Sequence, residues 1–132
     1  MAEPQVGMRI QMNLLDVLAA QCAKDSKEWF PEAANAASTN PEELTRALIH
    51  HSLAMCGEVG EVANLVKKVD RGTVDITNIV FQNDIHEELT DVFIYLLNLV
   101  ALLKIDLLKE YMKKRDKNVK RFSRTPQNGA RA

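Results

Sequence analysis

Two stretches of sequence decide the fold: MCGEVGEVANLVKKV at residues 55–69 and EELTDVFIYLLNLVA at residues 87–101. In both, apolar side chains recur every three or four residues, which is the spacing of one face of an α-helix. Both stretches also carry two carboxylates three residues apart, and side chains at that spacing project from the same side of a helix. The two pairs are Glu58 with Glu61 and Glu88 with Asp91.

The same periodicity extends these stretches into long helices and predicts two further ones. Asn40 followed by Pro41 is typical of a helix start, because Asn caps the first turn and Pro suits its first position. The β-branched segment TVDITNIVFQN at residues 73–83 lacks helical spacing and is predicted to connect two helices. In the absence of a convincing strand pattern, we expect an all-α fold resembling a four-helix bundle. The predicted helices cover about residues 8–30, 41–70, 83–103 and 105–122.

Size and composition favour one soluble domain. The 132 residues suffice for a single hydrophobic core, and 46% hydrophobic with 27% charged residues lies within the globular range. We therefore expect one domain over residues 1–132, with its core at about 8–122 and a flexible tail at 123–132. Neither a signal-peptide pattern nor an apolar run of the roughly 20 residues that span a membrane is found. Because Cys22 and Cys56 fit no disulfide or zinc pattern, a cytoplasmic location is expected.

The four carboxylates predict a metal site. If the two pairs face each other, they repel unless protons or divalent cations neutralise them. Oxygen ligands suit Mg²⁺, with Mn²⁺ as an alternative, better than zinc or copper. A di-iron site is disfavoured, because such bundles use Glu-x-x-His and no histidine here follows a glutamate by three residues. One Glu-x-x-Glu motif alone is common on solvated helices, so this prediction depends on the two motifs together.

Two glycines and two histidines lie on the same predicted helix as Glu58. Gly57 and Gly60 each cost about 1 kcal/mol relative to alanine in a helix interior, so we expect another helix or a ligand to approach them closely. His50 and His51 lie two turns before Glu58 and are interpreted as loosely packed helix residues rather than catalytic ones.

Taken together, these motifs resemble the MazG-like all-α nucleoside triphosphate pyrophosphohydrolases, a superfamily that includes the dimeric dUTPases and the dCTP pyrophosphatases. The signature of that superfamily, ExxE on one helix and ExxD on the next, is present in full. The segments EWFP at residues 28–31 and KKRDKNVKRF at residues 113–122 also look similar, so the resemblance covers roughly residues 20–122. One departure is Gly57, where some members carry glutamate, and this leaves the subfamily open.

The resemblance implies Mg²⁺-dependent hydrolysis of a nucleoside triphosphate, expected to be a dNTP and including non-standard ones, to monophosphate and pyrophosphate. It also implies a homodimer or homotetramer. The magnesium ligands would be Glu58, Glu61, Glu88 and Asp91, and the general base Glu58 or Glu61. The implied substrate contacts are Lys67, Lys68, Tyr95, Lys114, Asn118, Arg121 and, stacking on the base, Trp29.

Each implied contact has a plainer alternative. Lys67 and Lys68 also suit a solvated helix end, where cations complement the helix dipole. Trp29 and Tyr95 also fit as packing residues, and residues 113–124, with seven lysines and arginines, also suit a basic helix that binds nucleic acid. Two other functions therefore stay open: a non-catalytic helical interaction module and a nucleic-acid-binding protein. The base and sugar preference, the number of metal ions and the choice between dimer and tetramer are not predicted.

Overall fold

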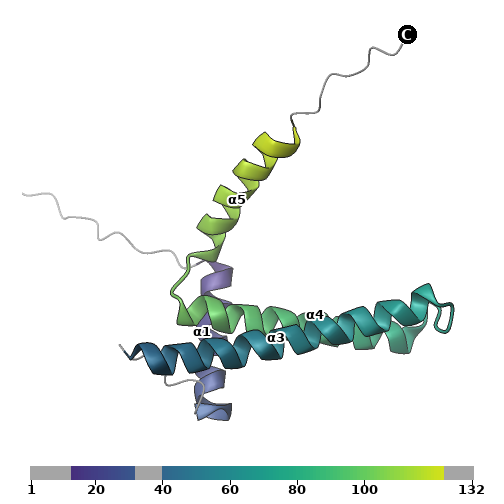
Figure 1. The fold of residues 1–132 in the computed structure, drawn as a ribbon, viewed down its shortest axis with the longest axis horizontal. Coiled ribbons are helices and arrows are strands. Elements are labelled where there is room, and N and C mark those ends of the chain that lie inside the picture. Colours follow the sequence, from purple (N-terminus) through teal and green to yellow (C-terminus); the bar gives the residue numbers. More distant parts are fainter. Residues whose placement is uncertain (1–12, 32–39, 124–132) are drawn as a thin grey trace, which may run out of the picture.

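The computed structural model describes residues 13–31 and 40–123, and these residues form four α-helices and no strand (Figure 1). The prediction of an all-α chain is therefore confirmed. Residues 8–12 of the first predicted helix, most of the 31–41 connection and the tail from residue 124 lie outside the described residues. The helices are α1 (Leu14–Trp29), α3 (Pro41–Asp70), α4 (Ile79–Leu102) and α5 (Leu107–Phe122).

Each helix begins at a side-chain cap. At α1, Asn13 accepts a hydrogen bond from the Asp16 backbone and the Asp16 side chain accepts one in return, which is a capping box. Asn40 caps α3 ahead of Pro41, as predicted. Asp106 caps α5. Because a cap of this kind contributes about 1 kcal/mol, the starts of the helices are set by local sequence.

The prediction that the third helix begins near residue 83 is wrong, because α4 begins at Ile79. The Asn78 side chain accepts hydrogen bonds from the backbone of Val80 and Phe81 at 2.9 and 3.1 Å, and so caps the helix one turn earlier. Each β-branched residue destabilises a helix by only a few tenths of a kcal/mol. The Asn78 cap stabilises it by more than that. The connection between α3 and α4 shortens accordingly to residues 71–78.

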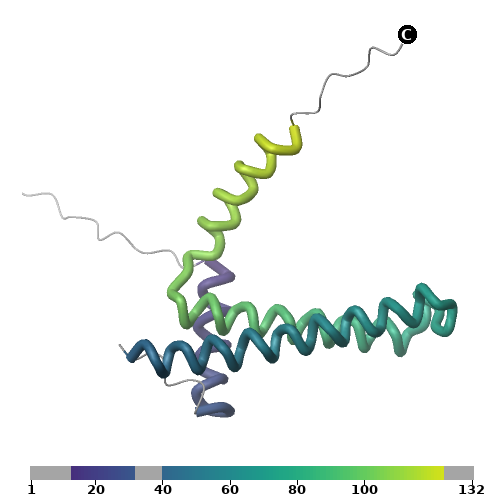
Figure 2. Tube along the Cα trace, in the orientation of Figure 1, coloured from purple at the N-terminus to yellow at the C-terminus, as the bar shows by residue number. Residues whose placement is uncertain are grey.

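Helices α3 and α4 form a long antiparallel pair, joined at one end by the 71–78 turn (Figures 1 and 2). Helix α1 crosses this pair and packs on α4 away from the turn, whereas α5 leaves the end of α4 and points away from the pair. The hydrophobic core lies where α1 crosses α4. Its buried members are Ala19, Leu97 and Val100.

The described chain leaves much apolar surface uncovered. Among its apolar residues only Ala47 and Phe81 are buried outside the α1–α4 crossing. Several large apolar side chains on α3 and α4 are about half exposed or more, including Val66, Ile79 and Leu89. A single described copy therefore does not close the bundle predicted from the sequence. None of the four helices is long and apolar enough to pass through a membrane.

Candidate functional site

Three of the four predicted acidic residues meet midway along the α3–α4 pair. One carboxylate oxygen from each of Glu58, Glu88 and Asp91 lies within 4.8 Å of the others. The antiparallel arrangement explains the meeting, because the middle of α3 then faces the middle of α4. The two acidic motifs, 30 residues apart in sequence, are thus side by side in space. We call Glu58, Glu88 and Asp91 the acidic cluster.

Glu61 lies at the edge of this cluster. It is exposed, and its carboxylate is not among the three that share the 4.8 Å distance. Its charge nevertheless helps to raise the pKa of Glu88, so the two groups interact. One turn of α3 separates Glu58 from Glu61, so the two side chains project from the same side of the helix.

The electrostatics of the cluster are those of crowded carboxylates. The pKa of Glu88 is raised above its usual value of 4.5, first by a hydrogen bond with the Glu58 carboxyl, then by partial desolvation. The negative charges of Glu58, Glu61 and Asp91 add to the increase. A proton shared between two carboxyls relieves this repulsion, and a divalent cation relieves it in the same way. A donor set made only of carboxylate oxygens fits Mg²⁺ or Mn²⁺.

A cavity of about 300 Å³ opens beside the cluster. Glu58 and Asp91 line it at the acidic end, and its other walls come from α1, the first half of α3 and the second half of α4. This volume is at the lower end of the range for small-molecule sites. Its remaining lining residues are Cys22, Asp25, Ser26, Trp29, Phe30, His51, Ile94, Tyr95 and Asn98.

Aromatic rings form one side of this cavity. Trp29, the single tryptophan of the chain, is 64% exposed, so it is not the core residue of the plainer interpretation. The rings of Phe30 and His50 are 5.8 Å apart between centroids, and those of His51 and Tyr95 are 6.1 Å apart. An exposed indole at a cavity wall presents a face on which a planar ligand can stack.

The interpretation of His51 as a loosely packed residue is wrong. Its side chain is only 2% exposed, and burial, followed by the charge of His50, lowers its pKa below the usual 6.5. The signal was available, because seven residues are close to two helical turns and place His51 on the same face of α3 as Glu58.

Two buried polar atoms at this cavity have no hydrogen-bond partner within the described residues. They are Oγ of Ser26 on α1 and Nδ1 of His51 on α3. The buried Asn98 beside them is satisfied, because its Nδ2 donates to the Ile94 carbonyl at 3.1 Å. An unpaired buried polar group costs about 1–3 kcal/mol, so the two orphaned atoms are a local cost in the ligand-free fold. The sequence did not single out Ser26.

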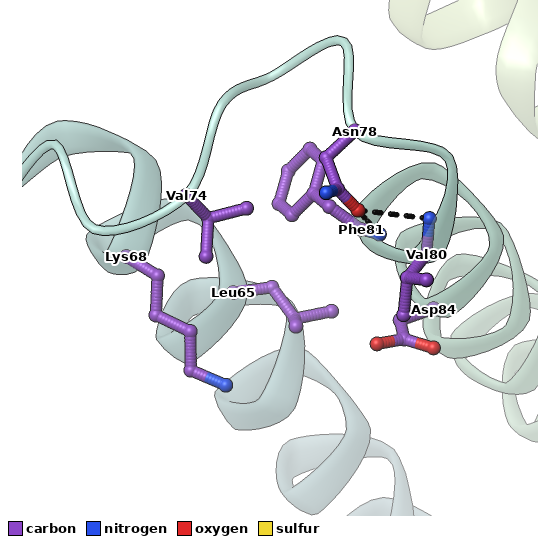
Figure 3. Close-up of a pocket in the computed structure, with 7 residues that line it drawn as sticks. All are labelled: Leu65, Lys68, Val74, Asn78, Val80, Phe81 and Asp84. Carbon is purple, nitrogen blue, oxygen red and sulfur yellow. Dashed lines mark hydrogen bonds between the residues drawn. The ribbon is translucent and has the colours of Figure 1, made fainter.

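The predicted lysine contacts lie elsewhere along the pair. Lys68 lines a second cavity of about 340 Å³, between the end of α3 and the start of α4, with Asp84 and Phe81 among its neighbours (Figure 3). Ten residues separate Lys68 from Glu58, which is about 15 Å along a helix. Lys67 and Lys68 occupy the last turn of α3, where the helix dipole favours cations. Within one described copy, neither lysine lines the cavity beside the acidic cluster.

The three predicted contacts on the last helix are also distant from the cluster within one copy. Lys114, Asn118 and Arg121 lie on α5, which points away from the α3–α4 pair (Figure 1). The Arg121 guanidinium instead lies 5.1 Å from the centre of the Phe122 ring. One copy therefore brings together the acids, Trp29 and Tyr95, but not the basic residues.

The expected tight environment of the two glycines is not met by the described residues. A Cβ atom added at Gly57 or Gly60 would have no heavy atom within 4 Å. Space therefore remains over this face of α3, next to Glu58.

Chemically, the arrangement suits a ligand with an anionic end and a planar end. Cations held by the acids would neutralise the anionic end. The planar end would lie among aromatic rings inside the cavity. Comparison of this chain with models of protein families, with curated proteins and with solved structures finds no match.

Proposed function

We propose that this protein is a magnesium-dependent pyrophosphohydrolase that cleaves nucleoside triphosphates, chiefly dNTPs, to the monophosphate and pyrophosphate. The observation that supports it best is the meeting of Glu58, Glu88 and Asp91 beside a cavity that Glu58, Asp91 and several aromatic residues line. Carboxylates of two helices meet beside a site large enough for a nucleoside. The resemblance to MazG-like enzymes adds the reaction, and we propose that the chain shares their fold.

In this proposal Glu58, Glu61, Glu88 and Asp91 hold Mg²⁺, or Mn²⁺ in its place. When bound, the metal supplies charge neutralisation for the phosphates and orients the attacking water. Glu58 or Glu61 accepts the proton of that water as general base. The hydrogen bond between Glu58 and Glu88 supports this role, because it requires one of the two carboxyls to carry a proton. Trp29 and Tyr95 hold the nucleoside, since both line the cavity.

We also propose that the protein works as a homodimer or homotetramer in the cytoplasm. The exposed apolar side chains of α3 and α4 support association, because a second copy would cover them. Association would also explain the basic residues. In one copy the predicted basic and polar contacts lie away from the acids. A neighbouring copy would instead bring its own contacts to the phosphates. These residues are Lys67, Lys68, Lys114, Asn118 and Arg121.

The test is pyrophosphate release from a panel of NTPs and dNTPs with Mg²⁺, repeated with Mn²⁺. Wild type is compared with Glu61→Ala and Asp91→Ala. Glu87→Gln is the matched control, because Glu87 neighbours Glu88 on α4 but is not part of the acidic cluster. We expect wild type and Glu87→Gln to release equal amounts of pyrophosphate and monophosphate, and Glu61→Ala and Asp91→Ala to release almost none.

Two alternative functions predict different results. A non-catalytic helical module would associate with itself but release no pyrophosphate from any nucleotide. A nucleic-acid-binding protein would bind DNA or RNA through α5, with an affinity that falls steeply with salt. Absence of turnover with both metals would therefore sink the proposal, and a salt-dependent nucleic-acid complex would then favour the last alternative.

A further inference from the structure

The two orphaned polar atoms beside the acidic cluster lie on different helices but at one cavity. Ser26 is on α1 and His51 is on α3, and their side chains are 6% and 2% exposed. Both residues line the 300 Å³ cavity, and neither Ser26 Oγ nor His51 Nδ1 has a partner within the described chain. They are the two buried side-chain atoms of the described residues left in this state.

Neither orphaned atom holds the described part of the fold together through a hydrogen bond. Hydrogen bonds from these two atoms contribute nothing to packing in the ligand-free chain, and apolar residues of similar shape would fill the same space without an orphaned group. A satisfied polar residue at the same cavity, Asn98, shows the usual solution, a bond to the helix backbone. Local departures from this rule are expected at functional sites, where a ligand supplies the missing partner.

The chemistry of the pair defines what it can recognise. A serine hydroxyl can donate and accept, and a neutral imidazole has one donor and one acceptor nitrogen. Burial keeps His51 neutral, because its pKa is lowered. The pair therefore complements a ring edge that presents a donor and an acceptor side by side. Trp29 and Tyr95 suit the faces of such a ring, and Glu58 and Asp91 of the acidic cluster line the same cavity.

We propose that Ser26 and His51 are specificity-determining residues, which hydrogen-bond the polar edge of the base of the nucleotide held in this cavity. Because Ser26 Oγ and His51 Nδ1 are buried in the ligand-free fold, the two side chains turn toward the cavity when the base binds. The proposal rests on the proposed function for the identity of the ligand, but it concerns residues that act on neither the metal nor the phosphates. It predicts that the site rejects a ring of the same shape without polar edge groups, because binding such a ring leaves both atoms unpaired.

The test uses full-length protein and unphosphorylated deoxynucleosides, so it requires neither metal nor turnover. Binding is followed by the fluorescence of Trp29, the single tryptophan, which lines the cavity. The tightest-binding nucleoside is compared with an isostere whose base carries C–H or C–F at the polar edge positions. We expect wild type to bind the natural nucleoside about tenfold or more tightly than the isostere. The variants are Ser26→Ala and His51→Phe, with Ser52→Ala and His86→Gln as matched controls outside this cavity.

Both variants should lose most of this tenfold discrimination and bind the isostere as wild type does. Ligand-free thermal stability provides a readout that a merely structural role would not give. Because each substitution removes an unpaired buried atom, we expect the melting temperature to be unchanged or higher. His51→Gln, which restores hydrogen-bonding capacity, should recover part of the discrimination.

Two results would overturn the inference. One is equal discrimination by wild type and by both variants. The other is a fall in melting temperature with unchanged nucleoside preference, which would make the pair structural. Turnover of dNTPs by variants with unaltered base preference would remove this inference and leave the proposed function intact. Selective nucleoside binding that depends on Ser26 and His51, without any turnover, would keep this inference and remove the proposed function.

Discussion

The two ends of the α3–α4 pair are incomplete in different ways. At the end covered by α1, Leu97, Val100 and Ala19 are buried, yet two polar atoms lack partners. At the end near the 71–78 turn, polar groups of the backbone are well satisfied by Asn78 and by turn hydrogen bonds. There the backbone is satisfied but apolar side chains such as Val66 and Ile79 lack cover, as Ile49 and Leu53 do in the first half of α3.

This difference separates two kinds of missing partner. Unpaired polar atoms around a cavity call for a small polar ligand, because only a group with donors and acceptors removes their cost. Uncovered apolar side chains on long helices call for another protein surface, because their cost scales with the area exposed to water. The acidic cluster lies between the two ends. Both the unpaired polar atoms and the uncovered apolar side chains are consistent with a site that a nucleotide completes on one side and a second copy completes on the other.

The largest effect of a substitution is expected at the acidic cluster, which lies between the two ends of the α3–α4 pair. Asp91→Asn removes the negative charge of one of the three carboxylates that approach within 4.8 Å and keeps the side-chain shape. We expect kcat/KM for the preferred dNTP to fall about 10³-fold, the scale for loss of one group that stabilises developing charge. Thermal stability without metal should not fall, because the substitution removes a carboxylate from a repelling cluster. Equal activity of Asp91→Asn and Glu87→Gln would remove Asp91 from the site.

The next effect contrasts the two ends directly. Leu97 is 1% exposed at the covered end, so Leu97→Ala should lower the free energy of unfolding by about 2–5 kcal/mol. Val66 is 49% exposed at the other end, and Val66→Ala should change it by less than about 0.5 kcal/mol in a monomer. Urea denaturation at two protein concentrations measures both. A larger, concentration-dependent loss for Val66→Ala would show that a second copy covers this end.

A smaller effect is expected at the turn end, from its cap. Asn78→Ala removes the acceptor for two backbone N–H groups at the start of α4 and should cost about 1 kcal/mol. Thr90→Ala is a useful control, because the Thr90 hydroxyl bonds only its own helix, to the His86 carbonyl. Hydrogen exchange should show faster opening at the first turn of α4 in Asn78→Ala. Unchanged protection there would mean that packing of Phe81, rather than the cap, sets the start of the helix.

Local patterns explain which parts of this fold the sequence predicted. The Asn40–Pro41 start and the end of α3 at Asp70 follow from capping and periodicity, and both were correctly predicted. The start of α4 was missed because the sequence interpretation assigned the β-branched and aromatic residues after Asn78 to the connection and did not consider Asn78 as a cap. The meeting of the two acidic motifs follows from the short turn, which makes α3 and α4 antiparallel neighbours.

The remainder of the site depends on tertiary contacts that no local pattern contains. Ser26 is an ordinary helix residue until α1 crosses α4 and removes it from water. The expectation of a close approach at Gly57 and Gly60 depended on a neighbour that the described chain does not supply. Likewise, spacing places Lys114 and Arg121 on one face of α5, but the direction in which α5 leaves α4 is set by the turn at Lys104, with φ of 53°. Periodicity carries no information about that direction.

The smallest expected effect is the dependence of stability on pH. It distinguishes His51, at the end covered by α1, from Glu88 of the acidic cluster. The pKa of His51 is lower in the folded state than its usual 6.5, so the unfolded chain binds more protons between these two values. Its contribution is therefore fully present above about pH 6.5 and is lost as pH falls toward the folded pKa. Glu88 acts in the opposite sense. Its folded pKa is raised above 4.5, so its protonation favours the folded state as pH falls.

Urea denaturation from pH 5 to 8 should show a loss of stability below pH 6.5 in wild type and Glu88→Gln, and a flatter profile in His51→Phe. A wild-type loss that persists in His51→Phe would place its origin in another histidine and would contradict a neutral, buried His51.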